Sequence, residues 1–197
     1  MRIHYSIVAS PLDDLLVAAS SKGICTVCLG KSESALEAAL RKEYPAAELR
    51  RDEETLSEWV QALLKHLDGQ QPHLELPLDL QATAFQWRVW KAVRNIPYGQ
   101  TRTYTEIARA IHHPGAARAV ARACATNPVA LVIPCHRIVR GDGSLGGYRW
   151  GLERKRKLLS REKSAAASAK KKWISELKSG DSNDTLLFMR EHPDAPN

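Results

Sequence analysis

The sequence is poor in cysteine and has no long apolar run. Its 197 residues include four cysteines, too few for a disulfide framework and compatible with free thiols in a reducing cytoplasm. No apolar segment approaches the roughly 20 residues of a membrane span. Residues 1–10 also lack the apolar core of a secretory signal. These absences predict a cytoplasmic globular protein with no membrane partner.

Acidic residues are scarce in one part of the chain. Residues 81–162 contain 15 Lys and Arg against four Asp and Glu, a net charge of +11, whereas residues 1–80 carry −5 and residues 163–197 carry +1. A basic segment beside a weakly acidic one is typical of a polyanion-binding domain with a neutral companion. A solvated basic surface would give the same charges, so the motifs must decide.

Residues 1–80 predict a small α/β unit. Short apolar or alternating runs separated by turn-forming clusters predict a three-stranded meander. These strands are expected at residues 3–9, 15–20 and 24–29. Capping patterns at Ser34 and Thr55 predict two helices after it. Residues 72–80, with two prolines, predict an extended linker.

The basic segment predicts a helix-turn-helix. Thr83 with Gln86 and Thr103 with Glu106 form capping boxes, each opening a helix. A third helix is expected over residues 116–126, after a tight turn that contains glycine. Helical hairpins of this kind also occur in proteins that never bind DNA, so the content of the third helix carries more weight.

The third helix would present Arg118 and Arg122 together with two small residues, Ala117 and Ala121. It offers none of the Asn or Gln side chains that pair well with adenine edges. Such a helix can approach DNA closely while reading little sequence. This combination favours a lesion-scanning protein over a transcription factor.

Cys135 is the candidate nucleophile. The apolar run 129–133 predicts a buried strand that ends on Pro134-Cys135-His136-Arg137. Proline fixes the backbone before Cys135, and a neighbouring histidine can shift the thiol toward the reactive thiolate. Cys124 lies on the apolar face of the predicted third helix, where a packed thiol is expected.

Cys25 and Cys28 have a C-x-x-C spacing that a zinc or redox site would also show. They fall in a predicted strand, where residues three apart point to opposite faces of the sheet. A second pair of ligands is absent nearby. We therefore expect no metal and no cofactor.

The end of the chain changes in composition. A basic helix is expected over residues 152–162. After it come a Ser/Ala-rich stretch, a lysine run and an Asp/Asn/Pro-rich end. This composition predicts a flexible tail over residues 164–197.

Ile133-Pro134-Cys135-His136-Arg137, followed by Gly147-Tyr148-Arg149-Trp150-Gly151, resembles the active-site region of the O6-alkylguanine-DNA alkyltransferases. The nearest branch includes the carboxy-terminal domain of the bacterial Ada protein. The resemblance extends over residues 1–162 and includes Ile96-Pro97-Tyr98-Gly99 and Asn127-Pro128. It implies a ribonuclease H-like α/β domain in residues 1–80. A mainly α, winged-helix-like domain with the helix-turn-helix would follow in residues 81–163.

The resemblance also implies roles for the residues around the thiol. Cys135 would accept the alkyl group, and His136, oriented by Glu162, would remove its proton through a water molecule. Tyr104 would help to swing the base out and donate a proton to the departing guanine. Asn127 would support the turn that carries the site.

The DNA-binding and pocket residues follow in the same way. Arg118 would fill the gap that the rotated nucleotide leaves in the duplex. Tyr148 with Arg149 and Trp150 would line the base pocket. Trp150 replaces a smaller residue of other branches, and its indole is expected to narrow the pocket for large adducts.

The expected function is repair of double-stranded DNA by direct reversal. A monomer would transfer one methyl group irreversibly from O6-methylguanine, and from O4-methylthymine, to its own Cys135. One alternative is a DNA-binding module without catalysis, such as a transcription factor or a lesion sensor, although such sensors lack the acceptor thiol. Another is a cysteine hydrolase that uses Cys135 and His136, which would turn over many times.

Overall fold

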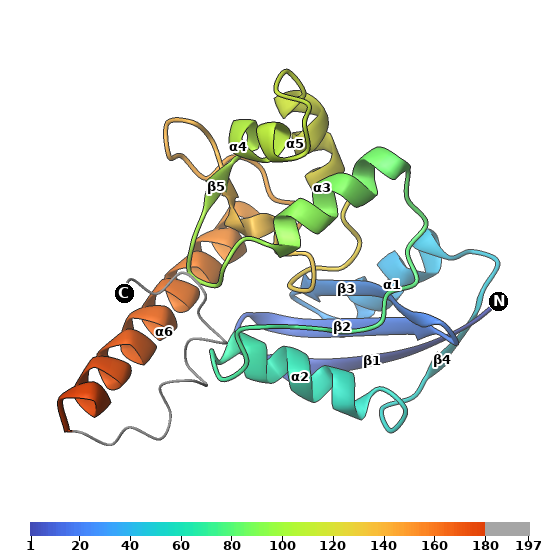
Figure 1. The fold of residues 1–197 in the computed structure, drawn as a ribbon. Helices are drawn as coiled ribbons and strands as arrows, with labels where there is room; N and C mark the ends of the chain where they lie inside the picture. The colour runs from blue at the N-terminus through green and yellow to red at the C-terminus, as the bar shows by residue number, and fades with distance from the viewer. Residues whose placement is uncertain (180–197) are drawn as a thin grey trace.

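The protein consists of a four-stranded sheet with two helices, a group of shorter helices, and one long helix that contacts both parts (Figure 1). The computed structural model describes residues 1–179. The first part contains β1 (Arg2–Ser10), β2 (Asp13–Ser20), β3 (Gly23–Gly30), α1 (Glu33–Glu43), β4 (Glu48–Arg51) and α2 (Ser57–Leu67). The second contains α3 (Ala84–Arg94), β5 (Arg102–Thr103), α4 (Tyr104–Ala110), α5 (Ala117–Ala125), the 3₁₀ turn η1 (Cys135–Arg137), β6 (Ile138–Val139) and α6 (Leu152–Ser179).

The predicted meander is confirmed and gains a fourth strand. The strand order is β3-β2-β1-β4, with β1 antiparallel to β2 and β2 antiparallel to β3. Strand β4 pairs parallel to β1 at the sheet edge. The sequence did not predict β4 because three of its four residues are charged and exposed, so the segment lacks the apolar alternation of a half-buried strand.

Both capping patterns predicted in the first part were wrong. Helix α1 begins after Ser32, whose hydroxyl accepts a hydrogen bond from Ala35 N (3.3 Å), two residues before the predicted cap at Ser34. Thr55 does not cap α2, because its own backbone N–H donates to Asp52 (3.0 Å). Ser32 offers the same hydroxyl as Ser34 two residues earlier, whereas Thr55 is held by Asp52 and α2 begins after Leu56 without a side-chain cap.

The sheet is covered differently on its two faces. Helix α1 packs on one face through Leu36 and Leu40. The other face belongs to a core that continues through α2 into α3 and α5 without a break, including Leu63 and Trp90. The Trp90 indole also donates to Ala123 O of α5 (2.9 Å). Because one core serves both parts, the sheet supports the helices that carry the candidate site.

The helical part follows the sequence prediction closely. Both capping boxes, at Thr83 and Thr103, are present. The turn between α4 and α5 contains His112 in the left-handed region, with φ 60°. On α5, Val120 and Ala123 are buried while the arginines face solvent. Figure 1 shows α4 and α5 side by side at the top of the molecule, which is the arrangement of a helix-turn-helix.

The predicted strand over residues 129–133 was wrong. The segment is buried but forms tight turns, with Leu131 at φ 69° and Ile133 N bonded to Val129 O (3.2 Å). It meets the sheet only in a local bridge at Val27, where Ala130 N donates to Val27 O (2.8 Å) and Val27 N donates to Pro128 O (3.0 Å). A short run of apolar residues is compatible with a buried strand and with a buried turn, so the sequence pattern could not distinguish the two structures.

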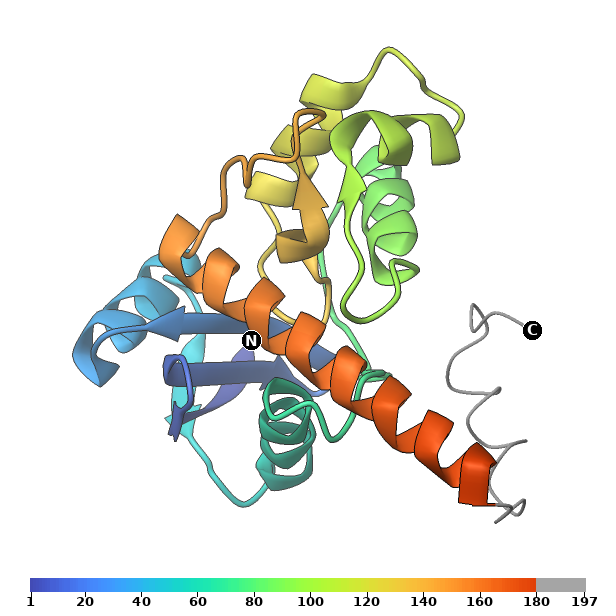
Figure 2. The same ribbon diagram turned by 90° about the vertical axis from the view of Figure 1, so that its left-hand side faces the viewer.

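Helix α6 is longer than predicted. It continues from Leu152 to Ser179 rather than ending at residue 162, so residues 164–179 are helical where a flexible tail was expected. Alanine and lysine, which dominate this stretch, are strong helix formers. Residues 180–197 of the predicted tail lie outside the described residues. In Figure 2 the orange helix passes diagonally across the side of the molecule where the sheet and helices α3 to α5 meet.

The added turns of α6 pack closely against both parts. A β-carbon at Gly69 would lie 2.6 Å from the β-carbon of Ala165, and one at Gly99 would lie 2.9 Å from that of Ala166. Both glycines also have positive φ, 75° and 77°. These contacts place the helix backbone directly against the loops that follow α2 and α3.

Truncation after Lys163 is therefore expected to destabilise the protein. The loss of Ala165, Ala166 and the helical turn that holds them should lower the free energy of unfolding by about 1–2 kcal/mol, from lost apolar contact. Urea unfolding of this variant, compared with a chain ending at Ser179, measures the effect. Equal unfolding midpoints for the two chains would contradict it.

Candidate active site

Cys135 lies at the first position of η1, directly after Pro134, and is 4% exposed. Its backbone N–H donates to Ile133 O (2.8 Å), so the tight turn before it fixes its direction. Its Sγ accepts a hydrogen bond from the Asn127 amide (3.3 Å). The thiol is thus buried and oriented.

Asn127 organises the turn that carries the thiol. It is fully buried, and its Nδ2 also donates to Ile133 O (2.8 Å) while its Oδ1 accepts from Val129 N (2.9 Å). One side chain therefore joins both ends of the 129–133 segment to Cys135. Each bond lies in the interior, where an unpaired donor or acceptor would be costly.

Glu162 of α6 is the central acceptor of a buried network of charged side chains. Its Oε1 lies 2.6 Å from His136 Nε2, and its two oxygens accept three bonds from the Arg137 guanidinium (2.9–3.2 Å). Gly99 N also donates to Oε2 (3.1 Å), and Arg137 donates a further bond to Ile96 O (2.7 Å). Glu162 is 2% exposed, so this pairing replaces its hydration.

The pKa shifts define the proton positions in this network. Burial alone would raise the pKa of Glu162, but the charges and hydrogen bonds of His136 and Arg137 outweigh it and the pKa is lowered. Burial lowers the pKa of His136, against the opposing effect of Glu162. Because Glu162 is ionised, it can only accept a hydrogen bond, so the ring proton of neutral His136 lies on Nε2 and is donated to the carboxylate. The other ring nitrogen, Nδ1, is buried and has no hydrogen-bond partner among the described residues, so it is free to accept a proton.

The thiol itself rests in the protonated form. Burial raises the pKa of Cys135 well above its ordinary value, and a hydrogen bond with the Cys124 thiol raises it further. The Asn127 amide and the Lys155 charge act in the opposite direction. The expected shift toward thiolate is therefore absent in the resting structure, because burial outweighs the neighbouring polar groups.

Lys155 is a part of the site that sequence reasoning missed. Its ammonium donates to Ile138 O (2.5 Å) and Gly147 O (3.3 Å), and the residue is fully buried. Burial lowers the pKa of Lys155 to about 8. The signal was present in the sequence, since Lys155, Leu158 and Glu162 follow a spacing of three and four residues that marks one helix face.

Tyr104 and the segment 146–150 close the site. A β-carbon at Gly146 would lie 3.1 Å from the Tyr104 hydroxyl, so this loop lies against the ring. Burial raises the pKa of Tyr104, which keeps its hydroxyl protonated. The Tyr148 ring meets that of His136 edge-on at 6.3 Å and that of Trp150 at 5.1 Å. The Tyr148 hydroxyl is buried without a hydrogen-bond partner in the described part of the chain.

Five predicted site residues make no direct contact with the thiol, one in the loop before α6 and four on α5. Arg149, expected in the pocket, donates to Asn127 O (3.1 Å) and pairs with Glu43 of α1 (3.3 Å). Arg118 and Arg122 are exposed on α5, with Ala117 and Ala121 partly exposed beside them. The structure thus separates a buried chemical centre from an open basic helix face.

The network continues to His66 in α2. The Tyr98 ring meets the His66 ring edge-on at 5.2 Å, and the Arg137 guanidinium lies over the Tyr98 ring at 5.3 Å. His66 Nδ1 contacts Gln71 O (2.7 Å), and the residue is 3% exposed. Burial lowers the pKa of His66 to about 4.

His66 is expected to make the fold acid-sensitive. Its pKa is lower in the folded than in the unfolded state, so unfolding takes up a proton and stability is lost as pH falls from about 6.5 to 4. The loss should reach about 3 kcal/mol below pH 4. Urea unfolding of His66→Gln across this range should show a shallower decline than the wild type, and parallel curves would contradict the prediction.

Cys25 and Cys28 are free thiols on β3, and burial raises the pKa of Cys28 to about 12. Within residues 1–179 no cluster of three or more His, Cys, Asp or Glu side chains is arranged to hold a metal ion. None of the helices described is both long and apolar enough to cross a membrane.

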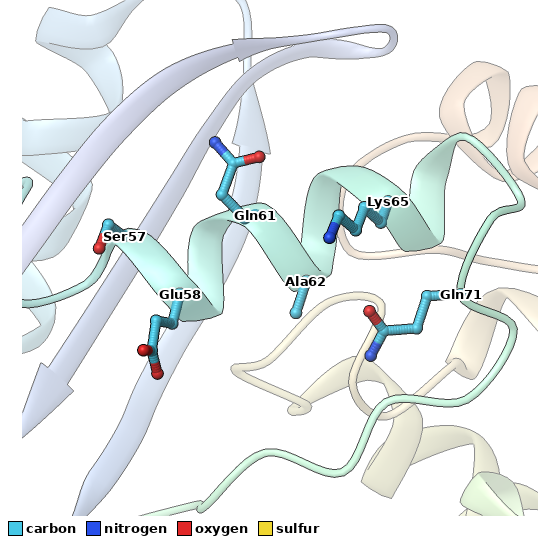
Figure 3. Close-up of a pocket in the computed structure, with 6 residues that line it drawn as sticks. All are labelled: Ser57, Glu58, Gln61, Ala62, Lys65 and Gln71. Atoms are coloured by element: carbon cyan, nitrogen blue, oxygen red, sulfur yellow. The ribbon is translucent and has the colours of Figure 1, made fainter.

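A separate hollow of about 350 Å³ lies along helix α2 (Figure 3). It is lined by Ser57, Glu58, Gln61, Ala62, Lys65 and Gln71. Of these residues only Gln71 touches the network described above, through its backbone oxygen on His66. The lining is largely polar and exposed, so the hollow is a surface depression of α2.

Two family models match the chain. The 6-O-methylguanine DNA methyltransferase ribonuclease-like domain matches residues 3–80, and the DNA binding domain of the same family matches residues 84–164. The chain belongs to the 6-O-methylguanine DNA methyltransferase family.

Individual relatives agree with this assignment. The chain is 44% identical over 162 residues to the Escherichia coli bifunctional transcriptional activator/DNA repair enzyme Ada, covering 82% of this chain and 46% of Ada. It is 42% identical to the methylated-DNA–protein-cysteine methyltransferase of Mycobacterium tuberculosis, covering 83% and 94%. The crystal structure of Mycobacterium tuberculosis OGT in complex with DNA is 37% identical, with a TM-score of 0.70 and coverage of 82% and 94%. The chain thus spans about half the length of Ada.

Proposed function

We propose that the protein repairs DNA by direct reversal, moving the methyl group of O6-methylguanine, and of O4-methylthymine, irreversibly to its own Cys135. The observation that carries the proposal is the buried Cys135 thiol, oriented by Asn127 and preceding a His136–Glu162 pair. The family and the relatives named for methyl transfer to a protein cysteine support it.

The transfer proceeds by a proton shift followed by attack on carbon. His136 Nδ1 takes the proton of Cys135 through a water molecule, and the positive ring is stabilised by ionised Glu162. The thiolate attacks the methyl carbon, the carbon–oxygen bond breaks, and Tyr104 donates a proton to the guanine. The product is a thioether that no group in the site can cleave, so each molecule acts once without a cofactor.

The target oxygen lies inside the base stack, so the nucleotide has to rotate out of the duplex at a cost of a few kcal/mol. Arg118 enters the gap and Arg122 binds the phosphate backbone, both from the exposed face of α5. Ala117 and Ala121 allow close approach of the helix. The rotated base enters the pocket beside Tyr148.

The two parts of the chain have different functions in this proposal. Residues 1–80 form the ribonuclease H-like support, and residues 81–163 form the winged-helix-like DNA-binding and transfer domain. One chain supplies every residue of the site, so the protein acts as a monomer on double-stranded DNA.

Intact-mass spectrometry after incubation with a duplex containing O6-methylguanine tests the proposal. The protein should gain the mass of one methyl group and stop at one equivalent, while the same duplex with guanine should give no gain. A cysteine hydrolase would process many equivalents of an ester substrate without a lasting mass change. No gain with the methylated duplex would overturn the proposal.

A further inference from the structure

The segment Gly147–Gly151, here called the pocket turn, forms one wall of the site. It closes on itself through a bond from Gly151 N to Tyr148 O (3.1 Å). It carries Tyr148, whose ring meets His136, and Trp150, which is 9% exposed. The position of this turn therefore determines how much space an alkyl group has next to Cys135.

One contact joins the pocket turn to helix α1. Arg149 of the turn pairs with Glu43, the last residue of α1, and donates to Asn127 O (3.1 Å). Asn127 in turn donates to the Cys135 sulfur. Arg149 thus connects the first part of the chain to both the pocket wall and the turn that orients the thiol.

A second contact holds the pocket turn at Trp150 itself. Arg154 donates from its Nε to Asp13 Oδ2 (2.7 Å) and from another guanidinium nitrogen to Trp150 O (2.8 Å). Asp13 begins β2 and belongs to the first part of the chain. The Arg154 side chain is 17% exposed, so this pair is better shielded from solvent than Glu43–Arg149.

We propose that Glu43 and Asp13 are positioning residues through which the amino-terminal domain sets the width of the base pocket and so the size of alkyl group accepted. This inference rests on the proposed methyl transfer. One pair holds the pocket turn at Arg149, and the other holds it through the Arg154 bond to Trp150 O. Without them the turn shifts outward, the indole no longer restricts the pocket, and larger adducts gain access.

The test measures single-turnover transfer rates for duplexes containing O6-methylguanine and O6-benzylguanine. The variant is Asp13→Asn/Glu43→Gln, in which the charges are lost but size is kept; asparagine also tolerates the positive φ of Asp13 (114°). A partly exposed ion pair shifts an equilibrium by about threefold, so the loss of both pairs should raise the benzyl-to-methyl rate ratio about tenfold. DNA affinity should stay unchanged. Glu43→Gln alone, at the exposed end of α1, should raise the ratio about threefold.

Asp68→Asn is the matched control. It removes the Asp68–Arg161 pair, which also joins the first part of the chain to α6 but lies away from the pocket turn. Its rate ratio should equal that of the wild type. An unchanged ratio in the double variant, or an equal rise in Asp68→Asn, would overturn the positioning role. Wild-type protein that accepts no methyl group would instead overturn the proposed function itself, and the positioning role with it.

Discussion

Replacing Cys135 with alanine is expected to abolish methyl transfer completely. The thiol is the only nucleophile that Asn127 holds in the site, and it precedes the His136 ring whose free nitrogen can take its proton. The variant should show no mass gain with a duplex containing O6-methylguanine. It should still bind the duplex, because the basic face of α5 is unchanged. Intact-mass spectrometry and a DNA-binding titration measure the two results.

Cys124→Ala is the control for that variant. Cys124 lies beside the acceptor, and its thiol raises the pKa of Cys135, so its removal should leave transfer intact and make deprotonation easier. Cys25 and Cys28 lie on β3 outside the site. A methyl gain in Cys135→Ala would mean that another residue is the acceptor and would contradict the assignment.

Glu162→Gln is expected to have the second-largest effect. The change leaves the Arg137 charge buried without its partner and removes the carboxylate that stabilises protonated His136. Breaking a buried ion pair should lower the free energy of unfolding by about 3–5 kcal/mol. Because His136 then lacks the carboxylate that stabilises its protonated form, methyl transfer should slow by at least about 100-fold. Urea unfolding and single-turnover kinetics measure these effects.

The pH dependence gives the same variant an independent signature. The pKa of Glu162 is lower in the folded state than its ordinary value of 4.5, so its stabilising effect is present above that pH and is lost as the pH falls below it. Glu162→Gln should lack this part of the acid-induced decline. Glu153→Gln, an exposed residue of α6 paired with Lys157, should leave both rate and stability unchanged. Equal behaviour of the two variants would exclude a special role for Glu162.

The sequence by itself determined the elements whose signals are local. Alternating runs and turn clusters defined the three-stranded meander, and the capping boxes at Thr83 and Thr103 defined where two helices begin. Helical spacing separated the buried face of α5 from the face with Arg118 and Arg122. These features depend on residues within one or two turns of each other, so a single segment contains all the information.

The tertiary structure decided what depends on distant partners. Residues 129–133 form turns because Asn127 and strand β3 make hydrogen bonds to this segment. The apolar run by itself is equally compatible with a strand. Arg149 pairs with Glu43, which lies 106 residues earlier in the chain. Lys155 differs from its basic neighbours only because its face of α6 is buried against Ile138 and Gly147. The motif around Cys135 identified the reactive thiol, but its protonation depends on burial, which only the assembled core creates.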